Sequence, residues 1–513
     1  MTACATLPPP PTLHSCFARC VLGSGEIYNY QTLAKELAGS TSAYKSDGFS
    51  LLPAYARWGE RFPTRLRGEW AMVLVDMQRQ RVILSTDAFA TKPLWYASWR
   101  ADGGKRRFAA ASVRSALQLL GAPKRRIVHL AETPNQVRVL SWKGEMGFEA
   151  VAQHTLVNWD LRQHKNHTRD WIAAFRESVR QRSSSASLNR QNLLYVSMSS
   201  GYDSGAIGLA LKLQGTKYAG FTFSKPDESG EDQTVIDARA RANQALGGTM
   251  EYLQLTDTDM QSERKWLDGH AEPVPVTKDR IATWRSYLAR RARAHAHLVH
   301  LSGQGSDEII SDYAIPGEVK LPCSCFGGVW PQRLESIFPW CTFYGGCQRL
   351  ILLREEYAAG SQGVETRYPF LDVDVVQEYL WLTAEAKNSA YKRPVADFMR
   401  EHSWPNAWGV KQINMAGSFK CTKKKNSKKA CIREGANAIN KRRRDDRERW
   451  KKWAQSAHQR KAITKSAVEG RRAGNPARSG KRKRQRSTGV AAPPSAAAPP
   501  ARALARSSWW RWG

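Results

Sequence analysis

The stretch Leu193–Ile207, LLYVSMSSGYDSGAI, changes character abruptly in its middle. Apolar and β-branched residues, typical of a buried strand, run up to Met198 and stop at Ser-Ser-Gly-Tyr-Asp-Ser. Small aliphatic residues then resume at helical spacing. We therefore predict a buried strand that ends in a polar loop and feeds directly into a helix.

The residues of this loop predict a phosphate site. A loop that joins the carboxyl end of a strand to a helix offers unpaired backbone N–H groups at the positive end of the helix dipole. Gly201 lets the backbone approach an anion, and the hydroxyls of Ser199 and Ser204 add donors. Asp203 would repel a bare phosphate, so we expect a magnesium ion to bridge its carboxylate and the phosphate oxygens. The alternative is an ordinary strand-to-helix turn.

The loop also lacks the Gly-Lys-Ser/Thr ending of a Walker loop. The expected ligand is therefore the pyrophosphate that leaves ATP, and not a transferred terminal phosphate.

A second stretch, HLVHLSGQGSDEIISDY from His297 to Tyr313, repeats this pattern. An apolar strand again ends in a glycine-bearing turn, now followed by Asp307 and Glu308. Two such turns at the carboxyl ends of strands in one sheet can converge on one crevice. We predict that Asp203 and Asp307 share the magnesium ion.

Two different layers of secondary structure are predicted. Between about 165 and 310, apolar strands at 193–198, 218–224, 250–255 and 298–302 alternate with helical patterns, which favours a parallel sheet covered by helices on both faces. From about 20 to 125 the chain shows strands and turns, with a hairpin predicted around MQRQ. This part is typical of an α+β layer with antiparallel sheet.

The net charge of +33 over 513 residues is uneven. Residues 420–513 hold 29 Lys and Arg against 5 Asp and Glu, so they contribute +24, and the remaining residues contribute +9. This tail cannot bury a core, and we expect it to be disordered. Its charge predicts salt-sensitive, non-specific polyanion binding, and its KRRR and KRKR runs are compatible with nuclear import.

The nine cysteines and the hydropathy pattern predict a soluble, cytoplasmic protein that does not interact with membranes. No apolar run reaches the length of a membrane span, and no secretory signal is visible at the start of the sequence. The pairs Cys323/Cys325 and Cys341/Cys347 match no standard zinc spacing. We expect them to be buried free thiols, in keeping with a reducing compartment.

Taken together, these motifs resemble a known family. SSGYDS is similar to the Ser-Gly-Gly-x-Asp-Ser signature of ATP pyrophosphatases, with Ser200 in place of the first glycine. LSGQGSDE and GVETRYPFLD (363–372) follow in the order found in asparagine synthetases and their relatives, the β-lactam synthetases and lasso-peptide cyclases. GEIYNYQTLAKEL, RLRGEWAMVLVD and STDAFATKPLWYA look like the class II glutamine amidotransferase domain that precedes the synthetase domain in this family.

The resemblance covers about residues 20–419 and implies an α/β protein of three parts. These are a truncated, glutamine amidotransferase-like α+β domain at 1–155 with antiparallel sheet, a parallel-sheet ATP-pyrophosphatase domain of the asparagine synthetase type at 165–419, and the basic tail at 420–513.

The resemblance also implies roles for individual residues, with ATP and Mg²⁺ as cofactors. Lys411 in WGVKQINMAG best matches the family's lysine that neutralises charge developing in the reaction. Glu365 and Arg367 are expected to form a buried ion pair that lines the cleft, with Glu365 acting either directly or as support. The residues expected to bind the nucleotide are Met198, Ser199, Gly201, Asp203, Ser204, Ser302 and Gly303, and the expected metal ligands are Asp203 and Asp307.

Two departures from the family pattern affect the expected chemistry. Ser24 stands where the family has an oxyanion-hole asparagine, and the family's N-terminal nucleophilic cysteine has no match, since Cys16 and Cys20 lie too close to GEIYNY. We therefore expect the glutaminase to be inactive as written. In addition, Gln304 replaces the glutamate that takes a proton from the attacking ammonia in asparagine synthetases, and an amide cannot act as that base. Glu365 or Glu308 could take the proton instead, or the nucleophile differs.

The function predicted from the sequence is ATP-dependent amide-bond formation through an acyl-adenylate, from a small carboxylate such as aspartate and from ammonia or an amine. One alternative is a lactam- or amide-forming relative that uses another amine. Another is a degenerate synthetase scaffold whose basic tail binds nucleic acid. The oligomeric state is left open, with a homodimer among the options.

Overall fold

The computed structural model describes residues 19–101, 104–142, 147–184, 193–223, 233–272, 280–315, 318–319 and 323–405. The predicted tail at 420–513 and the candidate residue Lys411 lie outside this range. Among the described residues, no helix combines the length and the apolar character that a membrane span needs.

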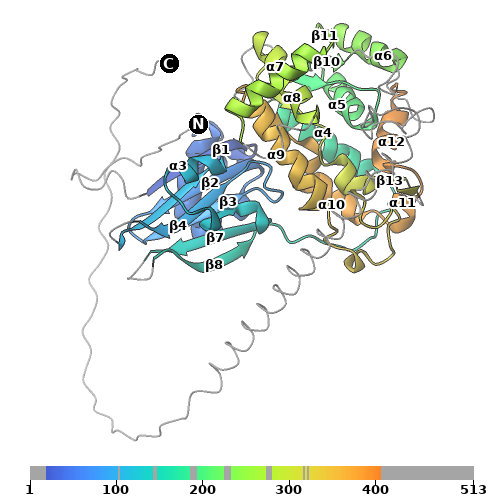
Figure 1. Cartoon of the computed structure of the whole chain (residues 1–513). Coiled ribbons are helices and arrows are strands. Elements are labelled where there is room, and N and C mark those ends of the chain that lie inside the picture. Colours follow the sequence, from blue (N-terminus) through green and yellow to red (C-terminus); the bar gives the residue numbers. More distant parts are fainter. Residues whose placement is uncertain are drawn as a thin grey trace, which may run out of the picture. The chain divides into compact units, whose positions relative to one another are not determined.

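The N-terminal part is built on two antiparallel sheets (Figure 1). The larger has the strand order β1-β2-β3-β7-β8 and the smaller the order β5-β4-β6. The predicted hairpin is the β2–β3 pair, in which Asp76 lies opposite Arg81. The strands are β1 (Arg19–Ile27), β2 (Gly68–Asp76), β3 (Arg81–Thr86), β4 (Trp95–Arg100), β5 (Arg106–Ala111), β6 (Ile127–His129), β7 (Gln136–Ser141) and β8 (Glu149–Thr155), with helices α1 (Tyr30–Ala38), α2 (Leu51–Trp58) and α3 (Arg114–Leu119).

Strand β2 is apolar on both of its faces because both are covered. Trp70, Met72 and Leu74 pack into one core with residues of α1 and α2. Ala71 and Val73 point to the opposite face and pack into a second core with residues of β4. The continuous run WAMVLV is therefore explained by helices on one face of the large sheet and the small sheet on the other.

The second half of the described chain is built on a parallel sheet of order β11-β10-β9-β12-β15. Its strands are β9 (Leu194–Ser197), β10 (Ala219–Phe223), β11 (Thr249–Leu253), β12 (Val299–Leu301) and β15 (Glu365–Arg367), and β13 (Ala314–Ile315) pairs with β14 (Glu318–Val319) outside it. The surrounding helices are α4 (Arg169–Ser183), α5 (Tyr202–Leu213), α6 (Gln233–Gln244), α7 (Asp257–His270), α8 (Arg280–Ala294), α9 (Gly346–Gly360), α10 (Val373–Trp381), α11 (Ala384–Asn388) and α12 (Arg393–Glu401).

This strand order places a topological switch point between β9 and β12. From β9 the sheet grows through β10 to β11 in one direction, and β12 and β15 lie on the other side. Leu194 and Val196 face one core while Tyr195 faces another, so helices cover both sides of β9. The predicted fold class, an antiparallel α+β part followed by a parallel α/β part, is confirmed.

Buried arginines join the two sheet systems. Arg182 at the end of α4 donates to Glu69 of β2 at 2.7 Å and to Asp372 at 2.9 Å. Arg367 of β15 donates to Glu26 of β1 at 3.2 Å. Both guanidinium groups are almost fully buried, so their charges depend on carboxylates contributed partly by the other sheet.

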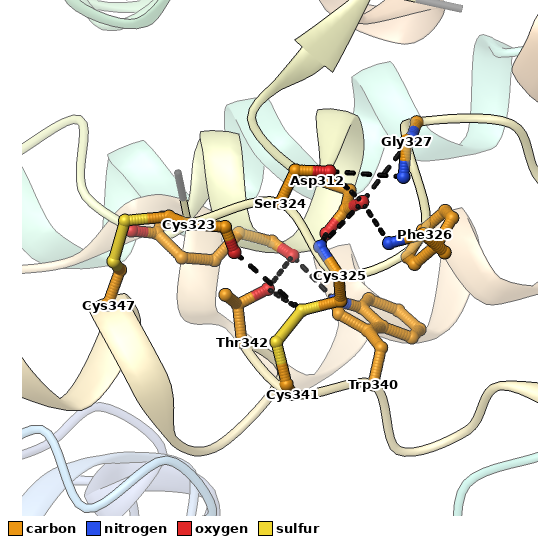
Figure 2. The surroundings of a disulfide bond; sticks show 12 residues. Asp312, Cys323, Ser324, Cys325, Phe326, Gly327, Trp340, Cys341, Thr342 and Cys347 are labelled. Atoms are coloured by element: carbon orange, nitrogen blue, oxygen red, sulfur yellow. Dashed lines mark hydrogen bonds between the residues drawn. A yellow bond between two sulfur atoms is a disulfide. The ribbon is translucent and has the colours of Figure 1, made fainter. Parts of the chain in front are cut away.

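The cysteine prediction was wrong. Cys323 is bonded to Cys347 and Cys325 to Cys341 (Figure 2). The fold brings the paired Cα atoms to 6.0 and 5.9 Å, a normal disulfide separation, which the sequence spacing alone does not reveal. The argument for a reducing compartment that rested on free thiols is therefore removed.

We predict that replacing Arg182→Met lowers the free energy of unfolding by about 3–5 kcal/mol, because Glu69 would stay buried beside an apolar side chain. The matched control is Arg180→Met on the same helix, whose pair with Glu177 is exposed and should contribute less than about 1 kcal/mol. Urea unfolding of both variants measures the difference, and equal losses would contradict the importance of the buried pair.

Candidate active site

The two predicted loops meet at the switch point. Val196 of β9 lies opposite Leu301 of β12, so the segments that follow both strands leave the same edge of the sheet. They touch at Gly303, where an added Cβ would lie 2.7 Å from the Cβ of Asp203. Glycine is therefore required at position 303 for the loops to approach this closely. The convergence inferred from the two motifs is present in the structure.

The first loop is ordered by its own hydroxyls. The backbone N–H of Ser199 donates to Ser204 Oγ at 3.0 Å, and the two hydroxyl oxygens lie 2.8 Å apart. Gly201 is the N-cap of α5, and its N–H points to Ser199 Oγ at 3.3 Å. Met198 is buried and its N–H extends the sheet by donating to Phe221 O at 2.8 Å. The predicted nucleotide residues of this loop thus lie together at the start of a helix.

Arg239 of α6, which the sequence interpretation missed, holds the carbonyls of this loop. Its guanidinium donates to Ser199 O and, at 2.9 Å, to Gly201 O. A Cβ at Gly205 would collide with the same guanidinium at 2.4 Å. With its carbonyls bound to Arg239, the loop has its electronegative groups directed toward a fixed cation.

Lys392 is the residue that joins the two predicted metal ligands. Its Nζ lies 2.7 Å from Asp203 Oδ1 and 2.7 Å from Asp307 Oδ1, and only 3% of its side chain is exposed. Asp307 also accepts hydrogen bonds from Tyr391 Oη at 3.2 Å and Ser311 Oγ at 3.1 Å. The carboxylates of two separate loops therefore share one cation.

Burial and charge act in opposite directions on these groups. Burial disfavours the charged form of Lys392, but the charges of Asp203 and Asp307 outweigh it and raise its pKa well above the usual value. Burial raises the pKa of Asp203, and the neighbouring Asp307 adds to the rise. Burial would also raise the pKa of Asp307, but the charge of Lys392 dominates and lowers it. Lys392 is thus a permanent positive charge between the two loops.

The two carboxylates fit a magnesium ion. They are hard oxygen ligands from adjacent loops, and both already contact one cation, so they are arranged to share a charge. Within the described ranges, no group of three or more His, Cys, Asp and Glu side chains converges on one point. Magnesium held here would therefore take its remaining ligands from phosphate oxygens and water, as is usual for this ion.

Polar side chains surround the second loop. Ser302 Oγ donates to both oxygens of Glu355 at 2.9 Å, and Glu355 pairs with Arg285 at 2.5 Å. A small cavity with room for about one water molecule adjoins this pair. It is lined by Tyr195, Ser197, Arg285, Leu288, His300, Glu355, Ala359 and Thr366. A polar, charged hollow therefore lies next to a predicted nucleotide-binding serine.

Gln304 is hydrogen bonded to a buried acid. Its Nε2 donates to Glu308 Oε1, which also accepts from Tyr313 Oη, while Gly305 N–H donates to Glu308 Oε2 at 3.0 Å. Glu308 is 1% exposed. Burial raises its pKa to about 7, and the nearby charge of Asp307 contributes. This acid can therefore exchange a proton near neutral pH.

The other predicted catalytic residues do not join this cluster. Glu365 pairs with Arg367 at 2.8 Å, as expected, but it lies opposite Val299 at the start of β12, while Ser302 follows the end of that strand. The pair lies where β15 contacts the N-terminal sheet. Lys411 is outside the described residues. The sequence analysis did not identify Lys392. Tyr-Lys-Arg-Pro indicates only the start of a helix, with proline in its first turn, and does not indicate which residues the lysine contacts.

Two family models match the chain. One, described as a glutamine amidotransferase domain, matches residues 11–118, and the other, described as asparagine synthase, matches residues 171–322. Among solved structures, a glutamine phosphoribosylpyrophosphate amidotransferase from B. subtilis matches with a TM-score of 0.22 and 12% identity over 46% of this chain and 60% of that chain. A likeness at that level supports no argument.

Curated relatives include two asparagine synthetases described as glutamine-hydrolyzing. The one from Sandersonia aurantiaca is 25% identical over 71% of this chain and 65% of its own length, and the nodule enzyme from Pisum sativum is 26% identical over 71% and 58%. Amidase chyE from Penicillium rubens is 27% identical over 56% and 46%. The chain thus covers between 46% and 65% of the length of these relatives.

We predict that Glu308 makes the stability of the protein depend on pH. Its pKa is raised from 4.5 to about 7, so the folded protein binds this proton more tightly than the unfolded chain. Stability should therefore fall as pH rises from about 4.5 to about 7, by up to about 3 kcal/mol from this group. Glu308→Gln should flatten that fall, and Glu335→Gln on the surface should not. Urea unfolding at several pH values tests this, and parallel curves for wild type and Glu308→Gln would contradict it.

Proposed function

The chain belongs to the asparagine synthetase family, and from this premise we propose that it forms amide bonds by activating a carboxylate with ATP. The observation that supports this most directly is the position of Asp203, Asp307 and Lys392, which share charge at the switch point of a parallel sheet. This is the place where open α/β sheets bind their ligands. Residues of both family motifs contribute to the cluster.

In the proposed first step, the substrate carboxylate attacks the α-phosphorus of ATP, an acyl-adenylate forms and pyrophosphate leaves. The loop from Ser199 to Ser204 would bind phosphate oxygens at the N-terminus of α5, where the helix dipole and backbone N–H groups favour anions. Asp203 and Asp307 would hold magnesium, which supplies charge neutralisation for the pyrophosphate. Ser302 and Gly303 would border the nucleotide from the second loop.

Lys392 is our candidate for stabilising the charge that develops in this step. It is a fixed cation in a largely buried position, and its Nζ lies between the carboxylates that would hold the metal. With Asp203 and Asp307 engaged in holding the metal, the Lys392 ammonium would be available to the phosphate and acyl oxygens. A preorganised charge in such a site typically changes the rate by ~10²–10³. Lys411 lies outside the described residues, so its role stays a prediction from the sequence.

In the second step, an amine attacks the acyl carbon, AMP leaves, and the amine nitrogen must lose a proton. Gln304 cannot accept it, while Glu308, four residues later and hydrogen bonded to Gln304, has a pKa of about 7, which suits a base at neutral pH. We therefore propose Glu308 as the proton acceptor, acting beside Gln304.

The enzymatic alternative is a related amide-forming reaction with a different amine. The substitution of Gln304 for the family's glutamate is the observation that favours it, because the residue that handles ammonia is changed. The likeness to Amidase chyE shows that chains similar to this one are not all described as asparagine synthetases. The two readings share the adenylate step and differ only in the nucleophile.

We predict that Asp203→Asn and Asp307→Asn each weaken magnesium-dependent ATP binding by at least about tenfold, which corresponds to about 1.4 kcal/mol. Each change removes one of the two charges proposed to hold the metal. Asp257→Asn, at an exposed position on α7, is the control. Isothermal titration with ATP in the presence and absence of magnesium measures the effect, and unchanged affinity in both variants would remove the shared-metal proposal.

We predict a different result for Lys392→Met. Because Lys392 is proposed to act on the developing charge, pyrophosphate release per bound ATP should fall by ~10²-fold or more. ATP affinity in the presence of magnesium should change much less, since the carboxylates remain. A loss of affinity as large as the loss of rate would mean that Lys392 only supports binding.

We predict that amide formation depends on added ammonia or another amine and not on glutamine. Ser24 occupies the position at which the family has an oxyanion-hole asparagine, and one donor of this kind typically contributes ~10²–10³ in rate. Product analysis of reactions that contain ammonium, glutamine or neither nitrogen source tests this prediction. Release of glutamate from glutamine by the purified protein would contradict this prediction.

A further inference from the structure

The segment 323–347, which we call the bridged loop, is closed by both disulfides (Figure 2). It lies against the short π-helix η7 (Asp307–Ser311), which presents Asp307 and Glu308 to the candidate site. The bridged loop is therefore directly attached to the element that provides one proposed metal ligand and the proposed base.

One end of η7 is held through Asp312. This residue is fully buried and adopts a left-handed backbone conformation with φ of 50°. Its carboxylate accepts hydrogen bonds from the N–H groups of Cys325 at 2.8 Å and Phe326 at 2.9 Å, and from Ser324 Oγ at 2.8 Å. A strained turn at the end of η7 is thus fixed by the first segment of the bridged loop.

The other end of η7 is held by the second segment of the bridged loop. Trp340 Nε1 donates to the carbonyl of Glu308 at 2.7 Å, and Thr342 Oγ1 lies 3.4 Å from the same oxygen. Cys341 stands between these two residues in the chain, and its disulfide partner is Cys325, whose N–H binds Asp312. The Cys325–Cys341 bond therefore links the two segments that are hydrogen bonded to opposite ends of η7.

We propose that the bridged loop is a site of thiol–disulfide exchange that controls how firmly Asp307 and Glu308 are positioned. Cys325 and Cys341 are exposed, so a reductant can reach their sulfurs. Opening the bond leaves Asp312 and Trp340 with their hydrogen bonds but no longer links the segments that provide them. η7 would then sample more conformations, and the carboxylate of Asp307 would meet Asp203 less often.

The exchange partner is a dithiol, of a small molecule or of a protein. One of its thiolates attacks a sulfur of the Cys325–Cys341 bond and releases the other cysteine as a thiolate, which takes up a proton. The second thiol of the partner then attacks the mixed disulfide and releases the remaining cysteine. Two electrons and two protons pass to the protein, which gains two thiols, and the partner becomes a disulfide.

Reduction should loosen the bridged loop without unfolding it. Trp330, Trp340 and Phe343 are buried in the main apolar core, and Trp330 and Trp340 pack edge to face at 5.1 Å. These contacts do not involve sulfur. The expected consequence is a graded loss of positional order in η7, and not loss of the domain.

The first test measures order directly and needs no nucleotide. Hydrogen exchange of the full chain, before and after treatment with dithiothreitol, should show faster exchange in 305–313 after reduction, while β9 and β10 stay protected. Ile309 N–H, which donates to Gly305 O at 2.9 Å, reports this segment. Mass spectrometry after alkylation establishes which cysteines are free. Unchanged exchange in 305–313 with both bridges open would overturn the proposal, as would finding the four thiols free in the isolated protein.

The second test rests on the proposed function and measures ATP binding with magnesium. Affinity should fall by about 5- to 150-fold on reduction, the range typical of coupling between sites, and return on reoxidation. Cys325→Ser with Cys341→Ser should bind like the reduced protein and respond little to dithiothreitol. If the oxidised protein binds no ATP, the proposed function is wrong. The hydrogen-exchange measurement then still tests the proposal for the bridged loop. If it binds ATP equally well in both states, the proposed control of the site is wrong.

Discussion

The contact of Lys392 with Asp203 and Asp307 joins three separate parts of the chain. Asp203 lies in the first turn of α5, Asp307 begins η7, and Lys392 caps α12, so one ammonium group fixes the relative positions of three elements. Two carboxylates this close together in a partly buried position would repel each other strongly without it. The Lys392 cation therefore offsets the repulsion between the two carboxylates. This allows Asp203 and Asp307 to lie close together, as the candidate site requires.

Opposite charges also meet at several other buried positions among the described residues. Arg182 and Arg367 are neutralised by acids of both sheets, and Lys92, which is 3% exposed, pairs with Glu356 at 2.8 Å. Such pairs add little net stability compared with apolar packing, but they tolerate very few alternative arrangements. These buried ion pairs thus specify one geometry at places where apolar packing alone would permit several arrangements.

The sequence predicted the fold well because its strongest signals are local. The apolar run Leu194–Ser197 followed by a polar, glycine-bearing loop is recognisable without any tertiary information, and so is the order of the motifs that places β9 beside β12. The sequence did not predict the contacts of Lys392 and Arg239 or the two disulfides, and the reason is the same in each case. Each depends on which distant segments become neighbours, and Lys392 lies 189 residues from Asp203. Glu365 forms the expected ion pair with Arg367, but this pair lies at the sheet-to-sheet contact and away from the loops.

The arginines that bridge the sheets have a consequence for how this architecture can change over time. A chain divided between β8 and α4 would separate Arg182 from Glu69 and Arg367 from Glu26, leaving guanidinium groups on a newly exposed face of one half and carboxylates on the other. The two halves are therefore expected to be retained together. The N-terminal half would be retained as a source of counter-charges whether or not it hydrolyses glutamine, because its loss would have to be accompanied by several compensating substitutions in the other half.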